Sequence, residues 1–257
     1  MSTVLDVAVC LLLIGVAVGT LAVAIPDERT GASVDSDPPA ETITTVTTSV
    51  SVDDGQHAHG TLAQHLARAV LLSARLDGDP LFESSYPEAT RDAVESDTPD
   101  RVHVTARWTP YSGAPLNATL SAGATPPSTA EVAATTLTVD SGVSIDSRDG
   151  STETVAAAVS EAYITRMFPP ERTRMALVDP RTASRTADRY RRFGGTLGVD
   201  IERPVSDAVP RRANGLLSAA LAARLDSGLR SKGTDPGGET TKVGPEHVEI
   251  VVRRWEP

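Results

Sequence analysis

The hydrophobic positions divide the chain into one uninterrupted apolar run and a longer region in which apolar and polar residues alternate. The apolar run extends from Val7 to Ile25, 19 residues without a charge, and Pro26 ends it. As a helix rising about 1.5 Å per residue it is roughly 28 Å long, which matches the hydrocarbon core of a bilayer. We therefore expect a transmembrane helix. The expected order is a short N-terminal tail over 1–6, the transmembrane helix over 7–25, an acidic, proline-containing linker over 26–41 and an exported domain over 42–257.

The apolar run has a second interpretation as a signal peptide, because Ala22-Val23-Ala24 has the small-x-small form of a cleavage site. An anchor is favoured by the absence of Lys and Arg from the first six residues and by the length of the run. The triplet Asn117-Ala118-Thr119 is a glycosylation sequon, and a modified Asn117 indicates an exported surface. We expect a single-pass protein of the cell membrane with a cytoplasmic N-terminus and an extracellular domain.

Beyond the linker, some segments have apolar residues at a period of two and others have them at helical spacing. Over 101–108 the apolar residues alternate with polar ones, so they share one face of a strand. Thr61 and Gln64 have the spacing of a capping box, which marks the start of a helix. Strands are predicted over 42–53, 101–108, 116–122, 132–145 and 247–255. Helices are predicted over 61–76, 86–96, 152–168, 181–193 (ended by Gly194-Gly195) and 211–230. Grouped strands followed by grouped helices predict an α+β fold, with a mainly antiparallel sheet and helices packed on one face.

Composition adds a marked charge asymmetry to this picture. The net charge is −10, and all but two of the 24 basic residues are Arg. Residues 1–100 carry a net charge of −12, whereas residues 166–257 carry +5. An acidic, Lys-poor chain suits a high-salt environment, although a GC-rich genome produces the same exchange of Lys for Arg. The asymmetry predicts an acidic and a basic surface that meet within one molecule or between molecules.

Motifs for catalysis are absent from the sequence. It contains no nucleophile elbow, phosphate-binding loop, dinucleotide fingerprint or zinc-protease helix. Three of the five histidines, His57, His59 and His65, fall within nine residues, but their spacing matches no common metal site. We therefore expect no enzyme activity, no metal and no cofactor, and we interpret the histidines as solvated residues near a helix start.

The most regular surface feature is a row of arginines at helical spacing, the arginine stripe, which comprises Arg181, Arg185, Arg189 and Arg192. Two interpretations stay open. The stripe docks an acidic partner, since Arg forms bidentate pairs with carboxylates, or it is a solvated face that pairs with the acids of residues 77–100. Nucleic acid is not an expected partner, because the protein is acidic and exported.

Asp6 lies directly before the apolar run, where a carboxylate is costly unless it reaches headgroups or a partner. An acid five or six residues from the N-terminus, followed by an apolar helix, resembles the mature start of type IV pilins and pseudopilins. In that family the acid pairs with the terminal amine of a neighbouring subunit. The resemblance implies that Asp6 is a subunit contact, whereas the alternative places it among lipid headgroups.

The layout as a whole also resembles uncharacterised single-pass proteins of halophilic archaea that are encoded with type IV pilus-like or secretion genes. The segments that carry this resemblance are Met1-Ser2-Thr3-Val4-Leu5-Asp6-Val7-Ala8, His59-Gly60-Thr61-Leu62-Ala63, Arg107-Trp108-Thr109-Pro110-Tyr111 and Val251-Val252-Arg253-Arg254-Trp255. It implies the lipid bilayer and pilus-like or secretion subunits as partners. We expect a structural or accessory component of such an assembly; the alternative is a membrane-tethered hydrolase or binding module with a site near His57–His65.

Overall fold

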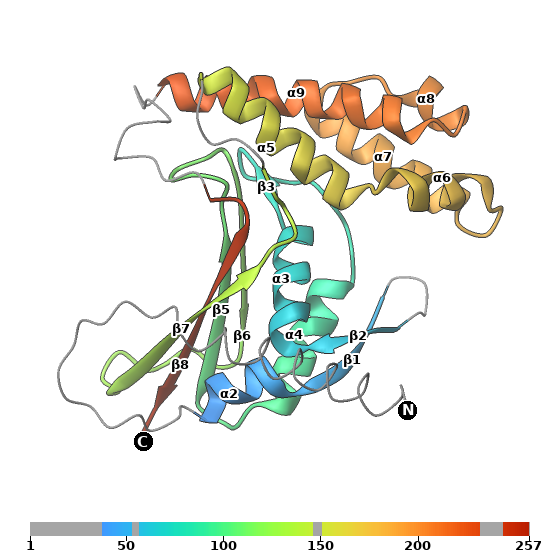
Figure 1. The fold of residues 1–257 in the computed structure, drawn as a ribbon. Helices are drawn as coiled ribbons and strands as arrows, with labels where there is room; N and C mark the ends of the chain where they lie inside the picture. The colour runs from blue at the N-terminus through green and yellow to red at the C-terminus, as the bar shows by residue number, and fades with distance from the viewer. Residues whose placement is uncertain (1–37, 53–56, 146–150, 232–243, 257) are drawn as a thin grey trace, which may run out of the picture. The chain divides into compact units, whose positions relative to one another are not determined.

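A computed structural model describes residues 38–52, 57–145, 151–231 and 244–256 (Figure 1). All of them belong to one compact unit, Asp37–Pro257. Asp6 and the apolar run lie outside the described residues, so the expected anchor stays a prediction. Among the residues that are described, no helix is long and apolar enough to cross a membrane.

The centre of the unit is a six-stranded sheet in which every neighbouring pair is antiparallel, with the order β4-β3-β6-β5-β8-β7. Its strands are β3 (Arg75–Leu76), β4 (Asp79–Pro80), β5 (Val102–Trp108), β6 (Leu116–Ala122), β7 (Val132–Asp140) and β8 (His247–Trp255). The four long strands confirm the predicted strands over 101–108, 116–122 and 247–255, and most of the one over 132–145. Strands β3 and β4 were too short to be predicted.

The segment before the first predicted helix differs from expectation. Residues 42–53 do not form one strand: helix α2 (Pro38–Thr45) precedes strand β1 (Thr47–Ser51), so part of the predicted linker is also helical. The hydroxyl groups of Thr42 and Thr45 donate to carbonyls four residues earlier, which lets these β-branched residues fit a helix. Strand β1 pairs with β2 (His57–Thr61) in a separate two-stranded sheet.

Two helices pack against the six-stranded sheet. Helix α3 (Leu62–Leu72) begins at the predicted capping box, in which Gln64 N–H donates to the Thr61 hydroxyl and Thr61 N–H donates to Gln64 Oε1. The helix contacts the long strands of the six-stranded sheet and is buried along almost its whole length, whereas α4 (Tyr86–Asp97) packs against α3 and β6. Both helices confirm predicted ones, although α3 ends four residues earlier than expected.

The remaining helices form a group at one end of the sheet (Figure 1). They are α5 (Thr152–Met167), α6 (Pro170–Val178), α7 (Ala183–Leu197), α8 (Glu202–Ser206) and α9 (Pro210–Ser231). Helices α5, α7 and α9 were predicted, while α6 and α8 were not. The prediction that Gly194-Gly195 ends α7 is wrong, because the helix continues to Leu197 and ends at Gly198, which has a φ of 71°. The α+β class and the antiparallel sheet are confirmed.

Aromatic side chains join this helical group to the sheet. Trp108 of β5 stacks on Tyr163 of α5 with ring centroids 5.3 Å apart. The Tyr163 hydroxyl donates to the carbonyl of Leu71 in α3, and the Tyr111 hydroxyl donates to that of Leu225 in α9. Sheet and helices therefore share one hydrophobic core.

Candidate functional site

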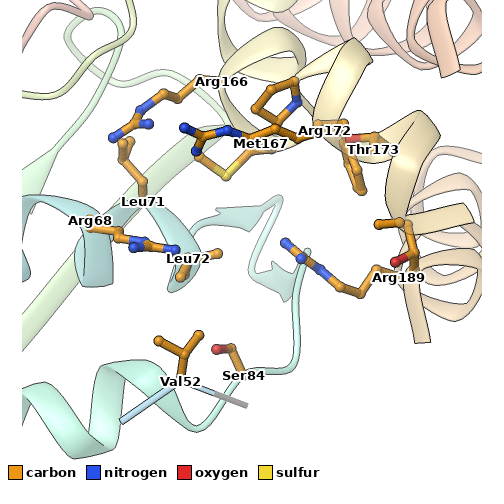
Figure 2. A pocket seen from close by; sticks show the side chains of 14 residues that line it. Val52, Arg68, Leu71, Leu72, Ser84, Arg166, Met167, Arg172, Thr173 and Arg189 are labelled. Carbon is orange, nitrogen blue, oxygen red and sulfur yellow. The ribbon is translucent and has the colours of Figure 1, made fainter. Parts of the chain in front are cut away.

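A cleft of about 330 Å³ opens where α3, the loop before α4, and the helices α5, α6 and α7 approach one another (Figure 2). Four arginines line it: Arg68 from α3, Arg166 from the end of α5, Arg172 from α6 and Arg189 from α7. We call it the arginine cleft. Figure 2 shows the side chains of Arg68 and Arg189 extending from opposite sides of the cleft toward its centre, with Arg166 and Arg172 along a third side.

Aromatic rings and a backbone carbonyl hold three of these guanidinium groups in place. Arg68 lies over the ring of Tyr86, 5.0 Å from its centroid. Arg189 lies 5.7 Å from the centroids of both Phe82 and Phe168. Nε of Arg166 donates to the carbonyl of Ser141, at 3.3 Å. Cation–π contacts leave the edge of a guanidinium group available, and its N–H donors lie along that edge.

The other lining residues are neutral. Leu71, Leu72 and Met167 supply apolar surface, and Ser84, Thr173 and Thr186 supply hydroxyl groups. No Asp or Glu is among the lining residues that the structure describes. Within the same described part of the chain, no ion pair joins a carboxylate to Arg68, Arg166 or Arg172. Because arginine stays protonated at physiological pH, the cleft concentrates positive charge in a protein that is acidic overall.

The structure divides the predicted arginine stripe. Arg181 precedes α7, and only Arg185, Arg189 and Arg192 belong to the helix. These three border the segment 81–83, where Arg192 forms an ion pair with Glu83. Arg192 therefore pairs with an acid from residues 77–100, as expected if the stripe is a solvated face that pairs within the chain. Arg189 instead lines the arginine cleft.

A strong ion-pair cluster lies one position away from the stripe and was not predicted. Nε and Nη2 of Arg191 donate to the two carboxylate oxygens of Glu202 at 2.8 and 2.9 Å, and Nη1 donates to Asp188. These bonds raise the pKa of Arg191 and lower that of Glu202. Glu202 belongs to the short helix α8, which carried no signal in the sequence, so this bidentate pair could not be expected.

The three clustered histidines do not converge. His57 and His59 are exposed on β2, whereas His65 is buried in α3 with 2% of its surface exposed. Nε2 of His65 contacts the carbonyl of Thr48 at 3.3 Å and Nδ1 contacts the Tyr86 hydroxyl at 2.5 Å. A carbonyl only accepts, so Nε2 carries the proton and Nδ1 accepts from Tyr86. His65 is thus a core residue and not a solvated one, which corrects the prediction. The described residues contain no group of three or more potential metal ligands.

Asn117 lies on β6 with its side chain exposed, and its Nδ2 donates to the carbonyl of Ala114 at 3.4 Å. The position is accessible, so the structure is compatible with the sequon, and modification at Asn117 stays a prediction. Asp6, the predicted subunit contact, lies outside the described residues.

Sequence reasoning found only one of the four cleft arginines. Arg189 belonged to the stripe, but Arg68, Arg166 and Arg172 come from three separate helices and share no motif. Only the tertiary arrangement of α3, α5, α6 and α7 brings them together, and no local pattern reports that arrangement.

Comparison with known families gives one match: the model of a family of unknown function, DUF7284, covers residues 5–255. No match is found among curated proteins or among solved structures.

Proposed function

Because the chain belongs to DUF7284, a family whose description assigns no activity, we propose its function from the site: it is a membrane-anchored binding protein whose folded domain docks an acidic partner in the arginine cleft. The observation that carries the proposal is the set of four arginines around one cleft with no acidic residue among its described lining. Guanidinium groups match carboxylates in bidentate geometry, and their hydrogen bonds to charged acceptors are among the strongest in proteins.

Binding is favoured over hydrolysis by the chemistry of the lining. The cleft offers hydroxyl groups from Ser84, Thr173 and Thr186, but its described lining contains no His, Asp or Glu to act as a base. The alternative of a hydrolase with a site near His57–His65 has no support from geometry, since these histidines lie apart and both ring nitrogens of His65 are hydrogen-bonded, to Tyr86 and to Thr48.

The membrane and assembly parts of the proposal rest on the sequence. The apolar run over 7–25 is the anchor, the N-terminus is cytoplasmic and the domain is extracellular. The resemblance of Asp6 and the following run to a mature pilin start supports an accessory role in a pilus-like or secretion assembly. Cross-linking in native membranes, followed by identification of the neighbours, tests this role; neighbours unrelated to such assemblies would remove it.

The cleft itself is tested with the full chain in detergent and a fluorescent hexaglutamate peptide, read by fluorescence anisotropy at low ionic strength. We expect Arg68→Gln with Arg172→Gln to weaken binding at least about tenfold, because each charge-assisted contact contributes about 1.5–3 kcal/mol. The double variant Arg174→Gln with Arg212→Gln is the matched control, since it removes the same charge from exposed positions outside the described cleft lining.

Binding in the control should stay within about twofold of the unmodified protein. Equal losses in both double variants would show that the peptide senses only overall charge, and the cleft would not be a site. A hexaglutamine peptide should not bind at all.

A further inference from the structure

The arginine cleft carries apolar surface next to its charges. Leu72 of α3 and Met167 of α5 line it; both are half-buried, and both pack against the hydrophobic core. Leu72 follows Arg68 by four residues, so the two side chains share one face of α3. Figure 2 shows Leu72 beside Arg68, and Met167 on the side of the cleft that holds Arg166 and Arg172. Arginines on two sides of the cleft therefore have an apolar neighbour.

These apolar side chains restrict the kind of anion that fits. A small hydrated anion such as inorganic phosphate gains nothing from apolar surface and loses part of its hydration beside it. A ligand that also carries an apolar group covers the same surface and removes it from water. The cleft volume of about 330 Å³ is at the lower end of the range for ligand sites, about 300–1,000 Å³. The cleft therefore suits a short peptide segment that is both acidic and apolar.

Positive charge reaches this apolar surface from opposite sides. Figure 2 shows Arg68 and Arg189 extending toward the centre of the cleft from facing walls. Arg68 rests on the ring of Tyr86, and Arg189 rests on the rings of Phe82 and Phe168. These contacts limit the movement of both guanidinium groups before a ligand binds, which reduces the entropic cost of binding. A segment with acids on both sides of one apolar residue meets both arginines at once.

We propose that the acidic partner enters the arginine cleft with a short peptide segment in which one apolar side chain lies between acidic residues, and that Leu72 and Met167 bind this side chain. The inference rests on the proposed function, because it names the chemistry of the partner at the same site. The flanking acids pair with the arginines, and the apolar side chain adds affinity through burial of its surface. The cleft thus distinguishes a mixed segment from a purely acidic one.

The test compares two fluorescent heptapeptides of equal charge. Both have three glutamates on each side of a central residue, which is leucine in one peptide and serine in the other. The full chain in detergent should bind the leucine peptide at least about fivefold more tightly, because burial of apolar surface favours leucine. Equal affinities for the two peptides would overturn the proposal.

Glutamine variants show whether the cleft causes this preference. Met167→Gln keeps the length of the side chain but removes its apolar end, so the preference for leucine should fall to within about twofold while the serine peptide binds as before. Leu72→Gln tests the same contact from α3 and should have the same effect. Met175→Gln is the matched control, because Met175 is 74% exposed on α6 and lies outside the described cleft lining, and it should keep the full preference.

Two results with these variants would reject the proposal. A preference for leucine that survives both Met167→Gln and Leu72→Gln comes from the detergent or from another surface. An equal loss of both peptides in these two variants means that the residues support the fold and do not bind the apolar side chain. Met167→Leu, which keeps an apolar side chain, should retain the preference.

The arginine variants separate this inference from the proposed function. If Arg68→Gln with Arg172→Gln weakens both peptides, but the unmodified protein binds the two peptides alike, the cleft binds acids without selecting an apolar side chain. In that case only the inferred selectivity is refuted. If the double variant weakens neither peptide, the cleft is not the acid-binding site, and the proposed function and the inferred selectivity are refuted together.

Discussion

His65 lies in the core where α3, α4 and β1 meet, and its two hydrogen bonds fix it as a neutral imidazole. Burial lowers its pKa below the usual value near 6.5, and the positive charges of Arg68 and His59 act in the same direction. The unfolded chain therefore binds a proton at a pH where the folded protein does not. The contribution of neutral His65 to the free energy of unfolding is fully present above about pH 6.5, and it decreases as the pH falls toward the lowered pKa of the folded state.

This linkage predicts a pH-dependent loss of stability that His65→Gln reduces. Between pH 7.5 and 5.5 the melting temperature of the unmodified protein should fall, and the slope should be smaller in His65→Gln, even though the variant starts from lower stability because the Tyr86 and Thr48 contacts are disturbed. His57→Gln is the control, because His57 is exposed on β2, and it should keep the original slope. An identical slope in His65→Gln would mean that other groups carry the dependence.

At this scale the sequence showed which residues are charged or apolar but not which ones meet. His57, His59 and His65 are close in the sequence, yet only His65 is buried, because the first two lie on β2 and the third on the inner face of α3. Arg68 and Arg172 are far apart in the sequence, yet both line one cleft. Tertiary contacts decide both outcomes, and no residue spacing reports them.

At the scale of elements, α7 shows how packing overrides a local signal. Adjacent glycines commonly end a helix, but Gly194 and Gly195 lie inside α7. A Cβ on Gly194 would lie 2.8 Å from Cγ1 of Ile201 and 2.9 Å from the carbonyl oxygen of Val199. The segment that follows the helix therefore occupies the space that a side chain at position 194 would need. At Gly195 a Cβ would meet nothing within 4 Å.

These two glycines predict opposite effects of the same substitution. Gly195→Ala should raise the free energy of unfolding by about 0.5–1 kcal/mol, because Ala restricts the unfolded chain and favours the helix. Gly194→Ala should lower it by about 1–3 kcal/mol, since Ile201 and the backbone of Val199 must move. Urea unfolding of both variants measures the difference, and stabilisation by Gly194→Ala would contradict the close packing.

Elements with a strong period were predictable, and elements set by packing were not. The alternation over β5 and the capping box of α3 each specify one structure, so both appear where the sequence placed them. Residues 42–45 of α2 were predicted to begin a strand because Thr and Val dominate residues 42–53, while the bonds from the Thr hydroxyls of α2 to preceding carbonyls become visible only in the structure.

At the scale of the whole molecule, Trp108 connects the sheet to the helical group. It is 2% exposed, stacks on Tyr163, and its Nε1 donates to the carbonyl of Pro245 at 2.7 Å. Trp255, the second tryptophan, lies near the end of β8 and is half-buried. Because both layers depend on the same buried side chain, we expect them to unfold together.

The two tryptophans provide a matched test of that coupling. Trp108→Phe should lower the free energy of unfolding by about 1–3 kcal/mol, since it loses a buried hydrogen bond and leaves a void. Trp255→Phe should change it by less than about 0.5 kcal/mol. In Trp255→Phe, the fluorescence of Trp108 and the helical circular dichroism should give the same urea midpoint. Separate midpoints would show that sheet and helices unfold independently.

The position of β8 also determines when this protein can fold. Strand β8 lies between β5 and β7, although β7 is made about a hundred residues before it. During synthesis, therefore, β5 and β7 emerge from the ribosome with no strand between them, and the sheet is completed only when residues 247–255 have been added. Because pairing over such a long separation is slow, the newly made domain stays open until residues 247–255 have emerged. A message truncated before residue 247 yields a chain without the strand that joins β5 to β7, which quality-control proteases can recognise as incomplete.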